Sequence, residues 1–210
     1  MRRNLISSAI AVVAFTVIFG LVYPLVMTGV SQVMFGSQSD GSQIERDGKV
    51  VGSKLIGQEF TKRVPSPGKP GKFDRVPDKL YFQSRPSATG YSADVTFFNN
   101  LGPNSADLAK QLKQIMAAYL ALERPYDPGL TQADVPADAV TTSASGVDPH
   151  ISQANARIQA HRIAAVRHMP LDRVDQLIDE NTADRALGFL GEPGVNVLEL
   201  NLALDQEASR

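Results

Sequence analysis

The chain begins with a long uncharged apolar segment, and this segment limits its possible folds more than any other feature. No charged residue occurs from Asn4 to Ser39, and Leu, Ile, Val, Ala and Phe dominate residues 5–30. A helix needs about 20 apolar residues to cross the roughly 30 Å hydrocarbon core of a bilayer. A core helix of this length would carry a polar face. A cleaved signal peptide has an apolar core of about 7–15 residues and an A-x-A-like site, which does not follow here. The sequence therefore predicts one retained transmembrane helix.

Basic residues near the ends of this segment predict its orientation. Arg2 and Arg3 precede the segment, whereas the first basic residue beyond it is Arg46. Positive side chains close to a membrane span stay on the cytoplasmic side. We expect residues 1–4 in the cytoplasm, a transmembrane helix over 5–30, a polar tether over 31–47 and an extracytoplasmic domain over 48–210.

A proline and several small residues bear on how the predicted helix packs. Pro24 directly follows Tyr23 and is expected to kink the helix or to mark its outer turn. Small side chains let another membrane helix approach closely, although they are common in any span. The candidate packing positions are Ser8, Ala11, Gly20, Tyr23 and Pro24. Spacing alone does not distinguish a packed partner helix from bare lipid.

Composition excludes several classes of protein. Cysteine is absent, which removes disulfides, thiol catalysis, iron–sulfur clusters and thiolate zinc sites. The 21 basic and 22 acidic residues give a net charge of −1, so nothing favours nucleic acid as a partner. The histidines are His150, His161 and His168, and the last two are too far apart on a helix to share a metal without other ligands. We expect no metal or cofactor to be bound by this chain.

Helical periodicity is clearest in three segments of the domain. The first helix is capped by Asn104 or Ser105, has Asp107 as a box partner, and ends before Pro125. The second begins after Pro149 with Ser152 as its cap, and the third opens at Pro170. The inward residues are predicted to be Leu108, Leu112, Ile115, Met116, Tyr119 and Leu122 in the first, Ala154, Ile158, Ala165 and Val166 in the second, and Leu171, Val174, Leu177 and Ile178 in the third.

Strand signals are short and scattered, so the domain is predicted to be α+β. The β-prone runs are Val50–Val51, Leu55–Ile56 and Leu80–Phe82. At the end of the chain Leu198, Leu200, Leu202 and Leu204 alternate with other residues, which predicts a final strand. Residues 61–79 carry six basic side chains, two acidic ones and four prolines. We expect an exposed, partly extended loop there, either a solvated face or a contact for anionic headgroups or an acidic partner.

The densest polar cluster is residues 143–152, SASGVDPHIS. A hydrolase using Ser145 and His150 is one alternative, but triads assemble from residues far apart in sequence and no G-x-S-x-G motif is present. Anion binding at the start of the following helix is another, without the glycines and lysine of a P-loop. The simplest interpretation is a turn before a helix, in which Asp148 and Ser152 accept hydrogen bonds from free backbone amides.

Distinctive stretches along the chain resemble the C subunit of the Kdp potassium-transporting ATPase, a bacterial inner-membrane complex. The stretches are GLVYPL (20–25), VGSxLIGQxF (51–60), YFxxRPSA (81–88), NLGPN (100–104), the 143–152 cluster, Gln159-x-x-Arg162 and GEPxVNVLxLN (191–201). They span nearly the whole chain in order. Two segments depart from the family pattern, since 61–79 is longer and more basic and 96–99 (TFFN) replaces a Gly/Ser-rich loop.

The resemblance implies an accessory role in a high-affinity potassium uptake complex. In that family a channel-like subunit carries potassium selectivity and a P-type ATPase subunit hydrolyses ATP. The C subunit is described as a catalytic chaperone that raises the ATP affinity of the pump subunit, so ATP is expected only through that subunit. The resemblance also implies a single-pass protein of the bacterial inner membrane. An anchored hydrolase and an anchored module that binds anions or peptides remain the alternatives.

Residues in these stretches are candidates for docking to partner subunits. The candidates are Gly57, Gln58, Arg85, Asn100, Asn104, Ser145, Asp148 and His150. Turn chemistry and buried hydrogen bonds explain such residues equally well. A domain docked on the outer face of the channel-like subunit, where it steadies or gates potassium entry, is the arrangement we expect.

Overall fold

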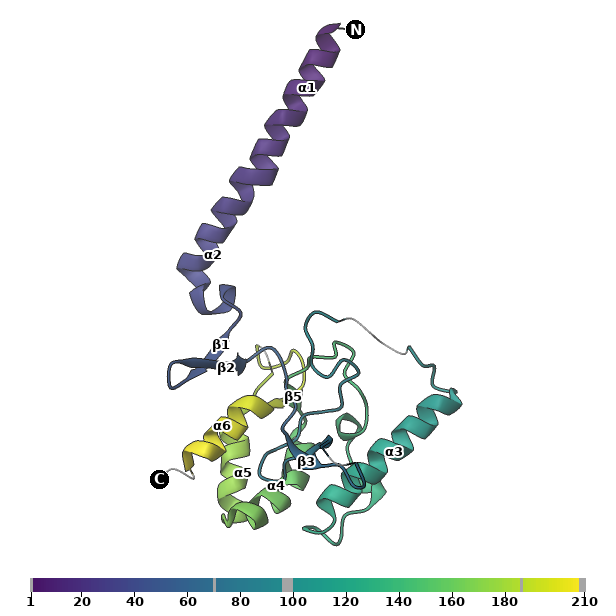
Figure 1. Cartoon of the computed structure of the whole chain (residues 1–210). Coiled ribbons are helices and arrows are strands. Elements are labelled where there is room, and N and C mark those ends of the chain that lie inside the picture. Colours follow the sequence, from purple (N-terminus) through teal and green to yellow (C-terminus); the bar gives the residue numbers. More distant parts are fainter. Residues whose placement is uncertain (1, 70, 96–99, 186, 208–210) are drawn as a thin grey trace. The chain divides into compact units, whose positions relative to one another are not determined.

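A computed structural model describes the chain at residues 2–69, 71–95, 100–185 and 187–207 (Figure 1). The chain divides into two compact units, Met1–Val51 and Gly52–Arg210. Helices and small sheets both occur, which confirms the predicted α+β class. The TFFN segment at 96–99 lies outside the described residues.

The first unit is built on one long helix, drawn in purple in Figure 1. α1 (Arg2–Val17), a π-helical turn (Ile18–Val22) and α2 (Tyr23–Ser39) follow one another directly, with a kink inside α2 at Phe35. The helix is long and apolar enough to cross a membrane, and no side chain in its described part, Arg2–Ser39, is buried. The predicted N-terminal apolar helix is therefore present and is consistent with a membrane anchor. Which side of a membrane each unit faces stays a prediction.

The π-helical turn lies directly before Pro24. Proline has no N–H to donate and its ring collides with the carbonyl four residues earlier, here that of Gly20. The backbone N–H of Tyr23 bonds to the carbonyl of Ile18, which widens the helix by one residue at this point. The helix continues well beyond Pro24, so this proline does not mark the outer turn. A second irregularity occurs at Phe35, whose φ of −138° and ψ of 43° are not helical.

The predicted tether at residues 31–47 contains more regular structure than its Gly/Ser content suggests. α2 extends to Ser39, and β1 (Gln43–Arg46) then pairs with β2 (Lys49–Ser53). Asp47 and Gly48 join the two strands with φ values of 52° and 72°. Positive φ at both turn positions is what a two-residue type I′ hairpin requires, and Asp-Gly is one of its favoured sequences.

In its described residues, the second unit combines four α-helices with small sheets. A three-stranded antiparallel sheet has the order β5 (His150–Ile151), β7 (Gly194–Asn196), β6 (Thr182–Ala183). The helices are α3 (Ala106–Glu123), α4 (Gln153–Arg167), α5 (Leu171–Glu180) and α6 (Val197–Glu207), with 3₁₀ turns at Gln132–Asp134 and Ala137–Ala139. Ser105, not Asn104, caps α3 by accepting a hydrogen bond from the N–H of Leu108. Ser152 caps α4 as predicted.

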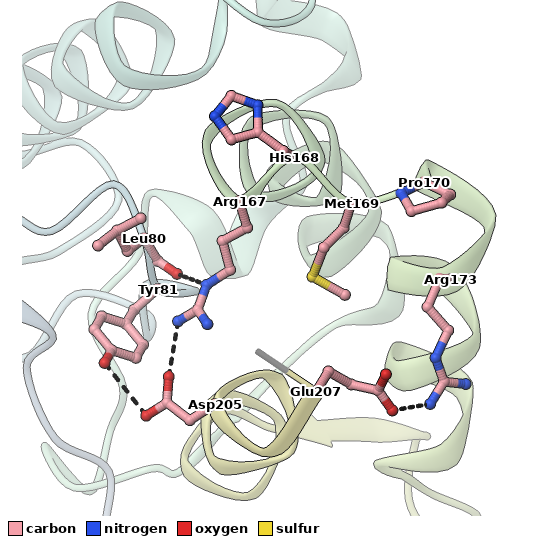
Figure 2. A pocket seen from close by; sticks show the side chains of 9 residues that line it. All are labelled: Leu80, Tyr81, Arg167, His168, Met169, Pro170, Arg173, Asp205 and Glu207. Atoms are coloured by element: carbon pink, nitrogen blue, oxygen red, sulfur yellow. Dashed lines mark hydrogen bonds and ion pairs between the residues drawn. The ribbon is translucent and has the colours of Figure 1, made fainter. Parts of the chain in front are cut away.

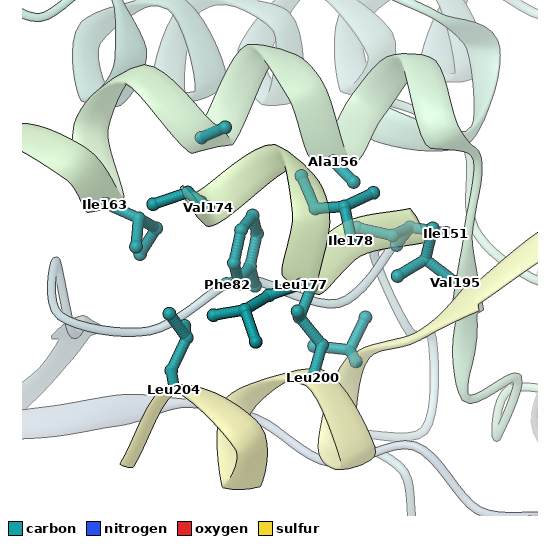
Figure 3. Close-up of a cluster of buried hydrophobic side chains, with 12 residues drawn as sticks. Phe82, Ile151, Ala156, Ile163, Val174, Leu177, Ile178, Val195, Leu200 and Leu204 are labelled. Carbon is teal, nitrogen blue, oxygen red and sulfur yellow. The ribbon is translucent and has the colours of Figure 1, made fainter. Parts of the chain in front are cut away.

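The hydrophobic core lies where α4, α5, α6 and β7 meet, and Phe82 is its largest apolar residue (Figure 3). The α5 face predicted from periodicity is the buried one, with Val174, Leu177 and Ile178 each at most 2% exposed. Figure 3 shows Phe82 in the middle of side chains contributed by α4, α5 and α6. Phe82 itself comes from an irregular segment that is far from all three helices in sequence.

The inward face of α4 differs from the predicted one. Ala154 and Ala165 are exposed, and Ile158 and Val166 are only half-buried. The buried residues of this helix are Asn155, Ala156, Gln159, Ala160, Arg162 and Ile163. Three of the six are polar or charged, so a search for apolar periodicity selects the wrong side of the helix.

The buried polar face of α4 is centred on Arg162, which is 0% exposed. Its Nε donates to both carboxylate oxygens of Glu123 at 3.0 Å, and its Nη2 donates to Gln159 Oε1 at 3.0 Å. Its Nη1 donates to the carbonyls of Lys79 and Tyr81 at 2.6 and 3.0 Å. Burial raises the pKa of the Glu123 carboxyl, and the Arg162 guanidinium opposes that shift. Every nitrogen of the guanidinium thus donates at least one hydrogen bond inside the domain.

Residues 80–82, predicted as β-prone, do not form a strand. Side-chain amides take the place of neighbouring strands. Asn201 Oδ1 accepts from the N–H of Phe82 at 2.8 Å, and Asn201 Nδ2 donates to the Phe82 carbonyl at 3.0 Å. In the same way, Gln159 Oε1 accepts from the N–H of Gln83 at 2.7 Å, and Gln159 Nε2 donates to the Gln83 carbonyl at 3.0 Å. These two side chains, from α6 and α4, form an amide clamp on residues 82–83.

The predicted final strand is wrong, because residues 197–207 form the helix α6. Val197, Leu200, Asn201 and Leu204 are all buried, and their spacing of three, four and seven is helical. Asn196 begins the helix by accepting a hydrogen bond from the N–H of Glu199. The buried face of this helix includes the polar Asn201, so its apolar residues alone do not show helical spacing. The remaining leucines alternate with other residues, which is the pattern of a strand.

Residues 61–79 also differ from the predicted loop. They contain a hairpin of β3 (Thr61–Pro65) and β4 (Phe73–Pro77), which pair antiparallel. Most of their side chains are exposed, as predicted.

Candidate functional site

Three separate stretches of the sequence meet around Asp148. Arg85 Nη1 donates to Asp148 Oδ2 at 2.9 Å, and the N–H of Gly57 donates to the carbonyl of Val147 at 2.8 Å. The 57–58, 84–91 and 143–150 segments therefore lie together. We call Gly57, Arg85, Asp148 and His150 the Asp148 junction. All four were docking candidates from the sequence.

The Asp148 carboxylate is the centre of this junction. Its Oδ1 accepts from the backbone N–H of His150 at 3.0 Å and lies 3.6 Å from His150 Nδ1. The His150 side chain is the largest influence, and with the His150 N–H and the Arg85 guanidinium it lowers the pKa of Asp148 to about 2, against partial burial. Asp148 is therefore an anion at physiological pH, and it fixes both Arg85 and His150.

Two glycines let the stretches approach each other. A Cβ on Gly57 would lie 2.6 Å from the carbonyl oxygen of Asp148 and 2.6 Å from the ring of Tyr91. Gly146 has a φ of 72°, and its carbonyl accepts from Ser87 Oγ at 2.6 Å and Thr89 Oγ1 at 3.2 Å. Any larger residue at position 57 would push the backbone segments apart.

The serine-rich part of the cluster is a turn. Ser143 Oγ accepts from the N–H groups of Ser145 and Gly146, each at 3.1 Å, and shares a hydrogen bond with Ser145 Oγ at 2.9 Å. Ser145 Oγ also accepts from the N–H of Val147. The hydroxyl of Ser145 is thus engaged with its own turn, whereas His150 contacts Asp148. This geometry does not provide the serine–histidine contact that a hydrolase needs.

A groove of about 330 Å³ adjoins the junction. Its charged and polar lining residues are Arg85, Asp138, Asp148, His150, Ser152, Asp184 and Glu192. Asp138 accepts hydrogen bonds from Ser152 N, Ser152 Oγ and Asn155 Nδ2 at the start of α4. A carboxylate of the chain is therefore already bound to the capping residue at the helix N-terminus that could have bound an anion. The excess of carboxylates favours basic side chains over anions as visitors to this groove.

The other candidates lie elsewhere. Asn100, with a φ of 47°, lines a separate hollow of about 330 Å³ near Leu108 and Thr142. Asn104 is exposed and precedes the α3 cap. The carbonyl of Gln58 accepts from Ser84 Oγ at 3.0 Å, so Gln58 borders the junction. In the first unit Ser8, Ala11, Gly20, Tyr23 and Pro24 are all exposed along the helix. Their role in helix packing stays a prediction.

A larger hollow, of about 600 Å³, lies between the end of α4, the start of α5 and the end of α6 (Figure 2). Arg167 Nη2 is 3.0 Å from Asp205 Oδ1, and its guanidinium lies 4.9 Å from the centre of the Tyr81 ring. Arg173 pairs with Glu207 on the other side (Figure 2). Burial, and then the charge of Asp205, raise the pKa of Tyr81. Each cation here faces its own carboxylate, so the hollow offers less unbalanced charge than the junction groove.

Sequence reasoning missed several residues that build the junction. Tyr91 donates its hydroxyl proton to the carbonyl of Arg85, and burial raises the pKa of Tyr91 to about 12. Thr89 and Asp138 were also not singled out. Thr89 contacts Gly146, which lies 57 residues further along the chain, and Asp138 contacts Asn155, which lies 17 residues further along. No local sequence pattern predicts contacts over such separations.

Comparison with known proteins identifies close similarities over nearly the whole chain. The model of the KdpC family, described as K⁺-transporting ATPase, c chain, matches residues 5–206. The potassium-transporting ATPase KdpC subunit of Streptomyces avermitilis is 45% identical over 199 residues, covering 91% of this chain and 88% of that protein. That of Mycobacterium tuberculosis is 43% identical over 208 residues, covering 98% and 100%. That of Koribacter versatilis is 42% identical over 207 residues, covering 98% and 95%.

Proposed function

The chain belongs to the KdpC family, the c chains of K⁺-transporting ATPases, and from this we propose that it is a non-catalytic accessory subunit of an ATP-driven potassium uptake complex. The observation that carries the proposal is the match over residues 5–206, which includes both the long apolar helix and the domain. Its partners are a channel-like subunit that selects potassium and a P-type ATPase subunit that hydrolyses ATP. The chain assists their assembly and acts as a catalytic chaperone that raises the ATP affinity of the pump subunit.

The geometry of the Asp148 junction supports a docking role over a catalytic one. Ser145 and His150 are engaged with different partners, so no nucleophile is paired with a base there. Arg85 and Asp148 are partly exposed, at 22% and 29% of their side chains, and their positions are fixed by hydrogen bonds. Fixed and partly exposed polar groups lose little conformational freedom when a partner binds.

The proposed topology places the domain outside the cytoplasm, at the outer face of the channel-like subunit. Arg2 and Arg3 at the start of the helix, with no further basic residue until Arg46, support this orientation. A domain outside the membrane cannot touch cytoplasmic ATP. Its effect on ATP affinity is then a coupling free energy transmitted through the membrane, and ATP must in turn change the affinity of the domain for its partner.

Purification of the tagged full chain in mild detergent tests the assembly. Two larger membrane subunits should co-purify if the chain is an accessory subunit. Their absence, under conditions that preserve a reference membrane complex, would contradict the proposal and favour a free-standing anchored hydrolase or binding module.

The absence of native cysteine makes topology directly measurable. Glu192, whose side chain is 79% exposed, is replaced in a Glu192→Cys variant and treated with an impermeant thiol reagent on intact cells. We expect labelling without permeabilisation. An Asn4→Cys variant is the matched control and should react only after the membrane is opened. The reverse pattern would place the domain in the cytoplasm.

The chaperone role is tested on the purified complex with and without this chain. We expect the KM for ATP to rise several-fold when the chain is removed and to fall again when it is added back. The Arg85→Gln variant should bind more weakly to the remaining subunits, whereas the control Arg157→Gln, at a 55% exposed side chain on α4, should not. An unchanged KM after removal would refute the chaperone role and leave the assembly role standing.

A further inference from the structure

The β3–β4 hairpin carries a strong positive charge that the proposed function does not use. The residues concerned are Lys62, Arg63, Lys69, Lys72, Arg75 and Lys79, against Asp74 and Asp78. The hairpin is short and antiparallel, with Arg63 opposite Arg75 and Pro65 opposite Phe73. Its charge is therefore held on a defined surface.

The two faces of this hairpin differ in the exposure of their apolar residues. One face carries Lys62, Val64, Asp74 and Val76, of which the two valines are half-buried and the two charged side chains are exposed. Side chains alternate between faces along a strand, so Arg63, Phe73 and Arg75 share the other face. All three are exposed, with Phe73 at 59% and the Arg75 side chain at 69%. We call Arg63, Pro65, Phe73 and Arg75 the outward face.

The outward face has two features that isolated folding does not favour. Arg63 and Arg75 are directly opposite each other, and like charges in that position destabilise a strand pair. Phe73 exposes a large apolar ring, with the Arg63 guanidinium 5.9 Å from its centre. The Glu59 carboxylate is 3.6 Å from Arg75, but both groups are solvent-exposed and such pairs contribute little. An anionic surface with an apolar layer beneath it would relieve both features.

We propose that the outward face of the β3–β4 hairpin binds the anionic phospholipid surface of the membrane in which the chain is anchored. The arginines contact lipid phosphates, and Phe73 enters the boundary between headgroups and acyl chains. Basic residues with an interleaved aromatic ring are typical of segments that lie in a membrane interface.

The anchoring helix is the reason for choosing a bilayer over an acidic protein. Thr61, the first residue of β3, follows the end of the long helix at Ser39 by only 22 positions. A chain attached so close to the hairpin keeps the bilayer at a high effective concentration. A weak affinity of each hairpin residue for the lipid surface is then sufficient to keep the hairpin docked. The proposal requires attachment to a membrane but not assembly into a pump.

A single cysteine in the hairpin turn makes docking measurable in the full chain. Pro67 is exposed between the strands, so a Pro67→Cys variant can carry an environment-sensitive fluorophore. The protein is reconstituted in nanodiscs of phosphatidylcholine alone or with about a third phosphatidylglycerol, and quenching by headgroup spin-labelled lipid is recorded. We expect strong quenching with phosphatidylglycerol and little without it. High salt should reduce the quenching, because it screens exposed charges.

Removing the two outward arginines gives the decisive comparison. One basic residue near an anionic surface changes a binding constant about five-fold, so Arg63→Gln with Arg75→Gln should lower the ratio of docked to free hairpin about 25-fold. This double variant removes a like-charge pair and should not unfold the hairpin. The matched control is Lys110→Gln with Lys113→Gln, which removes two exposed lysines from α3 and should leave the quenching unchanged.

Three results would overturn the proposal. The first is equal quenching in the two kinds of nanodisc, and the second is an equal loss in the α3 control. The third is a hairpin that stays unquenched until other subunits of the complex are added, which would identify an acidic protein surface as the partner. None of these results would contradict the proposed role as a pump subunit, which the co-purification experiment tests separately.

Discussion

Helices α4 and α5 pack against the same core, but the fully buried residues of α5 are all apolar, whereas half of those of α4 are polar or charged. α5 places Val174, Leu177 and Ile178 inside, and its outer face is polar. α4 places Asn155, Gln159 and Arg162 inside and leaves Ala154 and Ala165 in solvent. Apolar periodicity predicted the buried face of α5 and missed that of α4. A helix can therefore be central to a domain when half of the residues it buries are polar or charged, provided that these buried polar groups are paired.

The two faces also stabilise the domain differently. Apolar burial on α5 is non-directional and depends on filled volume. The α4 face depends on direction, because each buried donor must meet its acceptor. Removing one member of a buried polar set leaves the others without partners, whereas removing a methyl group leaves only a cavity. This difference leads to four measurable predictions.

The largest effect is expected at Arg162. Arg162→Met leaves the buried Glu123 carboxylate without its cation, and the free energy of unfolding should fall by about 3–5 kcal/mol. Urea unfolding of the full chain in mild detergent measures this. The double variant Arg162→Met with Glu123→Met should recover at least half of the loss, since it removes the orphaned charge. A loss below about 1 kcal/mol in the single variant would contradict the comparison.

A matched pair of size-conserving substitutions compares the loss of directional hydrogen bonds on α4 with a change of apolar packing on α5. Gln159→Met leaves the N–H and carbonyl of Gln83 unpaired and should cost about 2–4 kcal/mol. Leu177→Met keeps the volume of an equally buried apolar residue and should cost less than about 1.5 kcal/mol. Unfolding curves of the two variants, recorded side by side, give the difference. Equal costs would show that the two faces are equivalent.

Acid titration extends the comparison to the partly exposed Asp148 junction. The pKa of Asp148 is about 2 in the folded chain, below its ordinary 3.8. The contribution of this carboxylate to the free energy of unfolding is therefore present above about pH 4 and is lost as the pH falls towards 2. We expect about 1–2 kcal/mol, because solvent screens this site. Asp148→Asn should flatten the decline in unfolding free energy between pH 4 and 2. Asp179→Asn, which breaks an exposed pair with Arg157, should leave the decline as in the parent.

The smallest effect is expected at the beginning of α4. Ser152 Oγ accepts from the N–H of Asn155, whereas α5 begins at Pro170 without a side-chain cap. Ser152→Ala should lower the free energy of unfolding by about 1 kcal/mol. Ser105→Ala removes the equivalent side-chain hydrogen bond at the start of α3 and serves for comparison. A Ser152→Ala variant as stable as the parent would show that the Asp138 contacts hold this end alone.

Sequence alone predicted the elements whose buried residues are apolar or whose ends carry strong local signals. The boundaries of α3, the start of α5, the Ser152 cap and the long N-terminal helix belong to this group. α6 was predicted as a strand because Asn201 stands in a core position between leucines. The Asp47-Gly48 pair is typical of a hairpin turn, but the surrounding segment was predicted as a flexible tether because it is rich in Gly and Ser. Polar residues with structural roles account for these errors.

The candidate site could be predicted only in its parts. The stretches around Gly57, Arg85 and Asp148 were each identified, but nothing in the sequence showed that they meet. Arg85 and Asp148 are 63 positions apart, and their contact follows from the packing of the whole domain. Local patterns carry no information at that separation, so the junction became visible only with the fold.

The amide clamp on residues 82–83 has a consequence for how the domain folds. Its hydrogen bonds join Phe82 to Asn201 and Gln83 to Gln159, which are 119 and 76 positions apart. Contacts between such distant residues slow folding, because long loops must close before the contacts form. Phe82 cannot reach its final surroundings until α6, at the carboxyl end, has been synthesised. A chain whose core closes so late stays open while it is being made, and an open chain is the form that can be threaded across a membrane before it folds.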